Sequence, residues 1–135
     1  MTLWPVKEVM MGGRIKITVG ETDVNATLND TDTAAGVLDI LPVTASFNLW
    51  GDEIYFSIPL AMEEAEDARE IVAVGDIAYW PQGQALCIFL GKTPVSRGNE
   101  PRAISPVNVA GRVEAEGVPV LLNAVRQQNS ITIRR

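Results

Sequence analysis

The stretch from Gly75 to Pro94, G-D-I-A-Y-W-P-Q-G-Q-A-L-C-I-F-L-G-K-T-P, indicates two strands joined by a turn. Residues 77–80 are apolar or aromatic, as the pleated surface of a buried strand prefers. Pro81 fixes φ and Gly83 frees it, which suits a tight turn. Residues 85–90 form a continuous apolar run, long enough for a strand and short for a helix. Because neither arm has a polar face, we expect this hairpin to be covered on both faces and to lie at the centre of the core.

Composition sets limits on the kind of protein. The chain has 135 residues, the size of one ordinary domain, and 47% of them are hydrophobic, which is enough for a sizeable core. The formal net charge of -6 argues against non-specific binding to nucleic acid or to an anionic membrane. No apolar run approaches the roughly 20 residues of a membrane helix. We therefore expect a single cytoplasmic domain over residues 1–135, with residues 1–13 as a flexible lead-in.

The missing residue types exclude several chemistries. The sequence has no histidine, which removes Ser-His-Asp and Cys-His mechanisms and every histidine-ligated metal site. Its one cysteine, Cys87, lies in an apolar run that should raise the thiol pKa, so we expect a small buried hydrophobe and not a nucleophile. We expect no metal and no cofactor.

Three polar motifs have simple interpretations. Gly91-Lys92-Thr93 lacks the glycine five residues earlier that a P-loop needs. The acidic cluster within residues 63–67 has no calcium-loop spacing, so we expect a solvated loop. The pair Asp52-Glu53 follows a turn glycine, and we expect it to contribute only surface polarity.

The remaining segments indicate a chain rich in strands. Residues 34–41 and 118–125 have apolar side chains at i, i+3, i+4 and i+7, which predicts two short helices. Pro42 should end the first helix. A long surface loop is expected over residues 92–106, and Gly111 is expected at a bend. Strands are predicted at residues 14–19, 24–28, 44–50, 54–59, 70–74, 107–113 and 130–134, a pattern typical of a barrel or a sandwich.

Three segments carry a family resemblance: N-L-W-G-D-E-I-Y-F-S at residues 48–57, the hairpin at residues 75–94, and P-V-N-V-A-G-R-V at residues 106–113. They resemble the small prokaryotic cyclophilin-like proteins of uncharacterised function, over roughly residues 14–134. The resemblance implies a mainly β fold, a closed antiparallel β-barrel with one or two short helices. It does not imply prolyl isomerase activity.

Aromatic and amide side chains on strands that the resemblance makes neighbours indicate a ligand groove, with apolar walls and directional hydrogen bonds. The alternative is that some of them fill the core or cap it. The candidate ligand-binding residues are Asn48, Trp50, Tyr55, Tyr79, Trp80, Gln84 and Phe89.

The preferred hypothesis is a barrel that binds a small molecule or a peptide in this groove. A second is a peptidyl-prolyl isomerase. Cyclophilins place an arginine against the twisted amide, and the corresponding stretch here, residues 46–56, has neither arginine nor histidine, so Arg97 or Arg102 would have to replace it. A third, implied by the resemblance, is a non-catalytic subunit of a larger amide-hydrolysing enzyme. Whether the chain is an enzyme or a homo-oligomer stays open.

Overall fold

The structure is a computed structural model that describes residues 13–135. Strands account for 45% of the described residues and helices for 17%, and every strand pair is antiparallel. The expected mainly β, antiparallel fold with short helices is therefore confirmed. The lead-in predicted for residues 1–13 falls almost wholly outside the described part.

Ten strands and two α-helices make up the described chain. The strands are β1 (Arg14–Val19), β2 (Thr22–Leu28), β3 (Val43–Ser46), β4 (Asn48–Trp50), β5 (Glu53–Ser57), β6 (Arg69–Ile71), β7 (Asp76–Trp80), β8 (Ala85–Phe89), β9 (Arg102–Val113) and β10 (Ser130–Arg134). The helices are α2 (Asp32–Ile40) and α3 (Gly117–Val125), and a short 3₁₀ turn η1 (Pro81–Gly83) joins β7 to β8.

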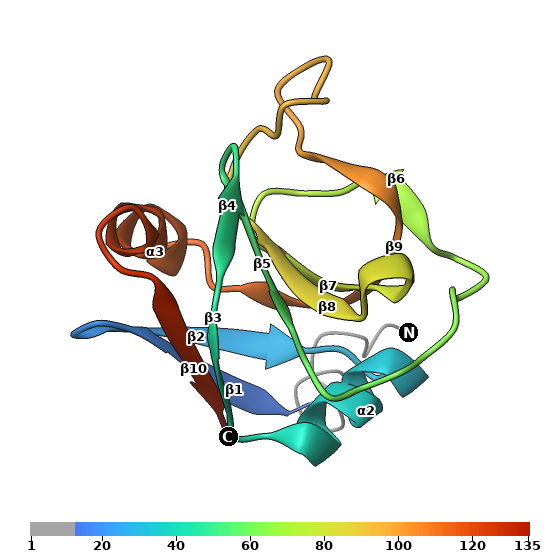
Figure 1. Ribbon diagram of the computed structural model, residues 1–135, viewed down its shortest axis with the longest axis horizontal. Helices are drawn as coiled ribbons and strands as arrows, with labels where there is room; N and C mark the ends of the chain where they lie inside the picture. The colour runs from blue at the N-terminus through green and yellow to red at the C-terminus, as the bar shows by residue number, and fades with distance from the viewer. Residues whose placement is uncertain (1–12) are drawn as a thin grey trace, which may run out of the picture.

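The strands form one hydrogen-bonded path in the order β3-β10-β1-β2-β9-β7-β8-β5-β4, with β6 added on β9. The path is rolled, so that β4 and β5 lie in front of β7 and β8 in Figure 1. No ladder joins its two ends, so the closed barrel that the resemblance implied is not confirmed. The two ends, β3 and β4, are separated in the sequence only by Phe47, so covalent chain bridges the gap.

The hairpin of β7 and β8 lies between β9 and β5, so both of its strands are inside the path and neither is at an edge. Alternate side chains of a strand point to opposite faces. One face of the hairpin, with Ile77 and Ile88, packs into the larger apolar cluster together with both helices. The other face, with Ala78 and Phe89, packs under Ala103 and Val107 of β9 in a second cluster. Both faces are thus covered.

Strand β9 is long and bent, and it supplies that second cover. It pairs with β7 and β2 through its second half and with β6 through its first. The register against β7 shifts between Ile77 and Ala78, opposite Gly111 and Val109, which leaves Ala110 as a bulge. A side chain at Gly111 would overlap the Thr27 carbonyl, so this glycine lies where β2 is too close to β9 for a β-carbon.

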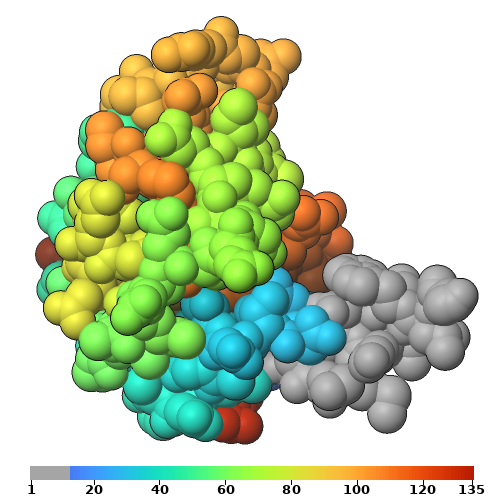
Figure 2. Space-filling view, turned by 90° about the vertical axis from the view of Figure 1, so that its right-hand side faces the viewer, coloured from blue at the N-terminus to red at the C-terminus, as the bar shows by residue number. Residues whose placement is uncertain are grey.

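The loop before β9 is shorter than predicted. Strand β9 begins at Arg102, so the surface loop ends near Pro101 and not at Pro106. The reason is that β6 pairs with this part of β9 through an irregular ladder, which tolerates a proline without an N–H. Figure 2 shows this loop as a projection at the top of the molecule.

Helix α2 begins where the sequence offered capping oxygens. Thr31 is its N-cap, and the threonine Oγ1 accepts a hydrogen bond from the Ala34 amide at 3.1 Å. The helix ends before Pro42, as predicted. Ala34 and Val37 on its apolar face are buried in the larger cluster, and Figure 1 shows the helix across the lower end of the sheet. No helix within residues 13–135 is long and apolar enough to cross a membrane.

Candidate functional site

The pairing of three adjacent strands, β4, β5 and β8, gathers one set of side chains on the face that β9 covers. Directly opposed residues in an antiparallel ladder share a face. Glu53 on β5 lies opposite Trp50 on β4 and Phe89 on β8. Tyr55, two residues further along β5, lies opposite Asn48 on β4 and Cys87 on β8. This face therefore carries an aromatic group on each edge and a carboxyl group between them.

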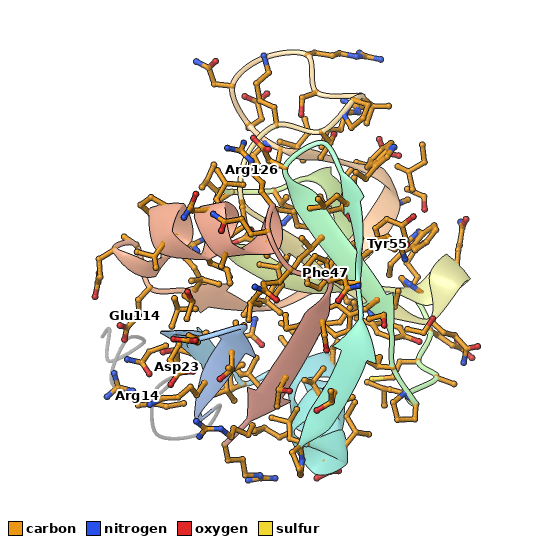
Figure 3. The ribbon with its side chains drawn as sticks, turned by 60° about the vertical axis from the view of Figure 1, so that its left-hand side comes forward. Arg14, Asp23, Phe47, Tyr55, Glu114 and Arg126 are labelled. Carbon is orange, nitrogen blue, oxygen red and sulfur yellow. The ribbon has the colours of Figure 1, made fainter. Side chains whose placement is uncertain are left out.

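A cavity of about 250 Å³ lies between this face and the first half of β9. Its wall is mostly aromatic and aliphatic, and it also contains one carboxyl and one thiol. The lining residues are Trp50, Glu53, Tyr55, Trp80, Cys87, Ala103, Ile104 and Val107. Figure 3 labels Tyr55 to the right of Phe47, toward the right-hand side of the molecule.

Trp80 is held on three sides. Its indole Nε1 donates a hydrogen bond to Ser105 Oγ at 2.7 Å. Its ring meets Tyr55 edge to face, with centroids 6.5 Å apart and planes at 83°. Gly83 lies against the ring so closely that a β-carbon there would overlap it. These three contacts hold this wall of the cavity in place.

Glu53 is buried, which corrects the prediction that it contributes only surface polarity. It is the first residue of β5 and is 5% exposed, and its Oε1 is buried without a hydrogen-bond partner in the described structure. Of the two acidic residues, only Asp52 lies in the turn between β4 and β5, where its carboxylate accepts a hydrogen bond from Arg126 at 3.1 Å. Figure 3 labels this arginine near the turn. Alternation along the strand separates the two carboxylates.

The surroundings of Glu53 change its acidity. Burial raises the pKa of Glu53 from 4.5 to about 7, and a hydrogen bond with the Cys87 side chain opposes that rise to a smaller extent. Burial, and then the nearby carboxylate, raise the pKa of Cys87 well above its ordinary value, so the thiol stays protonated as predicted. Near neutral pH, Glu53 can therefore either donate or accept a hydrogen bond inside an apolar wall.

The structure brings three of the seven predicted ligand-binding residues, Trp50, Tyr55 and Trp80, together at the cavity. Phe89 shares their face but is fully buried in the second cluster. Asn48 is exposed beside Tyr55 and does not line the cavity.

The other two predicted residues lie elsewhere. Tyr79 points into the larger cluster, where its hydroxyl donates to the Leu60 carbonyl at 2.7 Å and accepts from the Met62 amide at 3.2 Å. Gln84 is exposed at the hairpin turn, in the left-handed region with φ 47°.

Sequence reasoning missed Glu53, Cys87 and the three residues of β9 as parts of the cavity. For Glu53 and Cys87, the available signal was the alternation of side chains between the two faces of a strand. Glu53 shares a face with Tyr55, and Cys87 shares a face with Phe89, two residues further along β8. Nothing local in the sequence indicates that residues 103–107 fold back over the hairpin.

The cations considered for isomerase chemistry do not line the cavity. Arg102 donates to Glu70 Oε1 at 2.8 Å, and Arg97 is exposed in the loop after β8. None of the eight lining residues is a lysine or an arginine. Across residues 13–135, no group of three or more Cys, Asp or Glu side chains is arranged to hold a metal ion.

Comparisons with known proteins agree with the fold. The family model described as "Cyclophilin-like" matches residues 13–134. The solution structure of the hypothetical protein AF2241 from Archaeoglobus fulgidus is 33% identical, with a TM-score of 0.70, and the match covers 90% of this chain and 93% of that one. McbB, solved in complex with tryptophan, is 19% identical with a TM-score of 0.67, a likeness of fold alone. That match covers 90% of this chain but only 44% of McbB. The curated proteins contain no match.

Proposed function

The chain belongs to the cyclophilin-like family, and from this premise we propose that it binds a small aromatic molecule in the cavity under β9. The observation that carries the proposal is the set of three aromatic side chains, Trp50, Tyr55 and Trp80, around an apolar space with a single carboxyl group. Ligand sites are mostly apolar with a few directional polar groups, and this wall has that composition.

The size of the cavity favours a small molecule over a peptide. Its volume of about 250 Å³ is below the roughly 300–1,000 Å³ of sites for drug-sized ligands. A ligand with one or two fused rings would fill it. McbB, which shares the fold, binds tryptophan in its solved structure, and an indole is a ring system of this size.

The fixed position of Trp80 also supports the proposal. A side chain that is ordered before binding loses little conformational freedom on binding, so more of the contact energy remains as affinity. The contacts of Trp80 with Ser105, Tyr55 and Gly83 supply this order.

Isomerase chemistry has weaker support. The twisted amide needs a cation for electrostatic stabilisation, and among the described residues none lines the cavity. We therefore do not propose a displaced catalytic arginine.

A panel of one- and two-ring aromatic compounds, screened by thermal shift and followed by calorimetry, tests the proposed function. A compound that binds only the native state stabilises it by about 2.7 kcal/mol at a concentration of 100 Kd. Ile104→Ala removes cavity wall and should weaken the binding of any hit several-fold. Val120→Ala is the matched control, since Val120 is 51% exposed on α3 and Ile104 is 56% exposed. Equal effects of the two substitutions, or no hit in the panel, would contradict the proposal.

A further inference from the structure

We propose that Glu53 makes this cavity selective for aromatic molecules that carry a basic nitrogen, with the ligand N–H donating to the Glu53 carboxyl group. The inference rests on the proposed function, because it concerns the same cavity and adds the chemical class of the ligand.

The unpartnered oxygen is the first observation. Buried polar atoms are almost always hydrogen-bonded, because leaving one unsatisfied destabilises the folded protein. Glu53 is 5% exposed, its Oε1 has no partner in the described structure, and the side chain lines the cavity. Glu53 therefore borders the space beside the aromatic walls while one of its two carboxyl oxygens has no partner in the described structure.

The charges around the cavity are the second observation. The titratable side chains in the lining are Glu53 on β5, Tyr55 on the same strand and Cys87 on β8. The neighbouring Asp52 is directed to Arg126. The lining offers a carboxyl group and no cation, so it favours a positive ligand group over a negative one.

The aromatic walls act in the same direction. The faces of tryptophan and tyrosine rings attract cations, and the attraction is stronger when the cation is desolvated. Trp50, Tyr55 and Trp80 share the cavity with Glu53. An ammonium group that reaches the carboxylate would therefore lie among these rings, while the ring system of the ligand packs on Ile104 and Val107.

The raised pKa of Glu53 fits this assignment. In the free protein near neutral pH, part of the population carries a proton on Glu53, because burial disfavours the carboxylate. A protonated amine favours the carboxylate, so its binding should release a proton to solvent from that part of the population.

The test compares two probes with the same indole ring, tryptamine and 3-ethylindole, by calorimetry on the wild-type protein. Tryptamine should bind at least tenfold more tightly, because only it carries the amine. In Glu53→Gln, this preference should fall below about threefold, while the affinity for 3-ethylindole stays within twofold of wild type. Glu64→Gln, on the exposed loop before β6, is the matched control and should keep the preference.

Two outcomes would overturn the inference. Equal affinity of the two probes for wild-type protein would show that Glu53 does not select the amine, and it would leave the cavity as an aromatic site. Binding of neither probe at millimolar concentration would also overturn it, and the compound panel decides separately whether the cavity binds other rings. Because the wild-type comparison comes first, a Glu53→Gln variant that fails to fold does not remove the test.

Discussion

Replacing Glu53 by glutamine should make the protein more stable at pH 8 than the wild type, and the advantage should disappear at pH 4. The carboxyl has a pKa of 4.5 in an ordinary setting and about 7 in the folded protein, because burial disfavours the charge. Below pH 4.5 both states are protonated. As the pH rises from 4.5 through 7, the unfolded chain ionises first, so wild-type stability falls.

The magnitude follows from the separation of the two pKa values. One unit corresponds to about 1.4 kcal/mol, so a rise from 4.5 to about 7 costs the wild type about 3 kcal/mol once both states are ionised. Glutamine has nearly the same shape and no charge, so Glu53→Gln should not show this loss. The Cys87 thiol should not titrate in this range, because its pKa is raised well above its ordinary value.

Urea denaturation at half-unit steps from pH 4 to pH 8.5 measures the effect. The quantity to plot is the free energy of unfolding of Glu53→Gln minus that of wild type. In this difference, the pH dependence from titratable groups that both proteins share cancels. It should rise by about 3 kcal/mol over the range. The exposed Glu64→Gln control should give a flat difference. A flat or falling difference for Glu53→Gln would refute the burial of an ionisable carboxyl at this position.

Three further substitutions test the geometry around the cavity and the core. Gly83→Ala should displace the Trp80 indole, weaken the binding of aromatic ligands and change the tryptophan fluorescence; no change in either would refute the close contact. Tyr79→Phe removes a hydroxyl that bonds two backbone groups. Its free energy of unfolding should fall by about 1–3 kcal/mol in urea, with ligand affinity unchanged, since Tyr79 faces away from the cavity. Gly111→Ala should lower the free energy of unfolding by about 1–3 kcal/mol in the same assay, because the new carbon overlaps the Thr27 carbonyl. An unfolding free energy equal to that of wild type would contradict the close contact between Gly111 and Thr27.

Most of the fold could be predicted from the sequence, because the local pattern of apolar and polar residues indicates which faces of a strand or helix are buried. The hairpin at residues 75–94 had no polar face, and the structure covers both of its faces. Capping oxygens before α2 and a proline after it set its two ends. Closure of the sheet could not be read in this way, since it depends on which distant segments pair, and burial alone does not specify partners.

The candidate site was only partly accessible from the sequence. Tyr79 and Trp80 are adjacent on one strand, so alternation prevents both from facing the same groove, and the structure directs only Trp80 to it. Glu53 follows a turn glycine, a position where charged residues usually meet solvent. Residues of β9, about 50 positions later in the chain, line the same cavity as Glu53, and no local pattern indicates that they return to it.

The break in the sheet at Phe47 also bears on how the protein behaves in concentrated solution. Strands β3, β4 and β6 each leave one side without a ladder, but they have only four, three and three residues. An exposed strand edge is a template on which other chains can add, and a long, flat edge is the most prone to it. Because these unpaired strands are short, the described part of this chain offers little length on which intermolecular aggregation could begin.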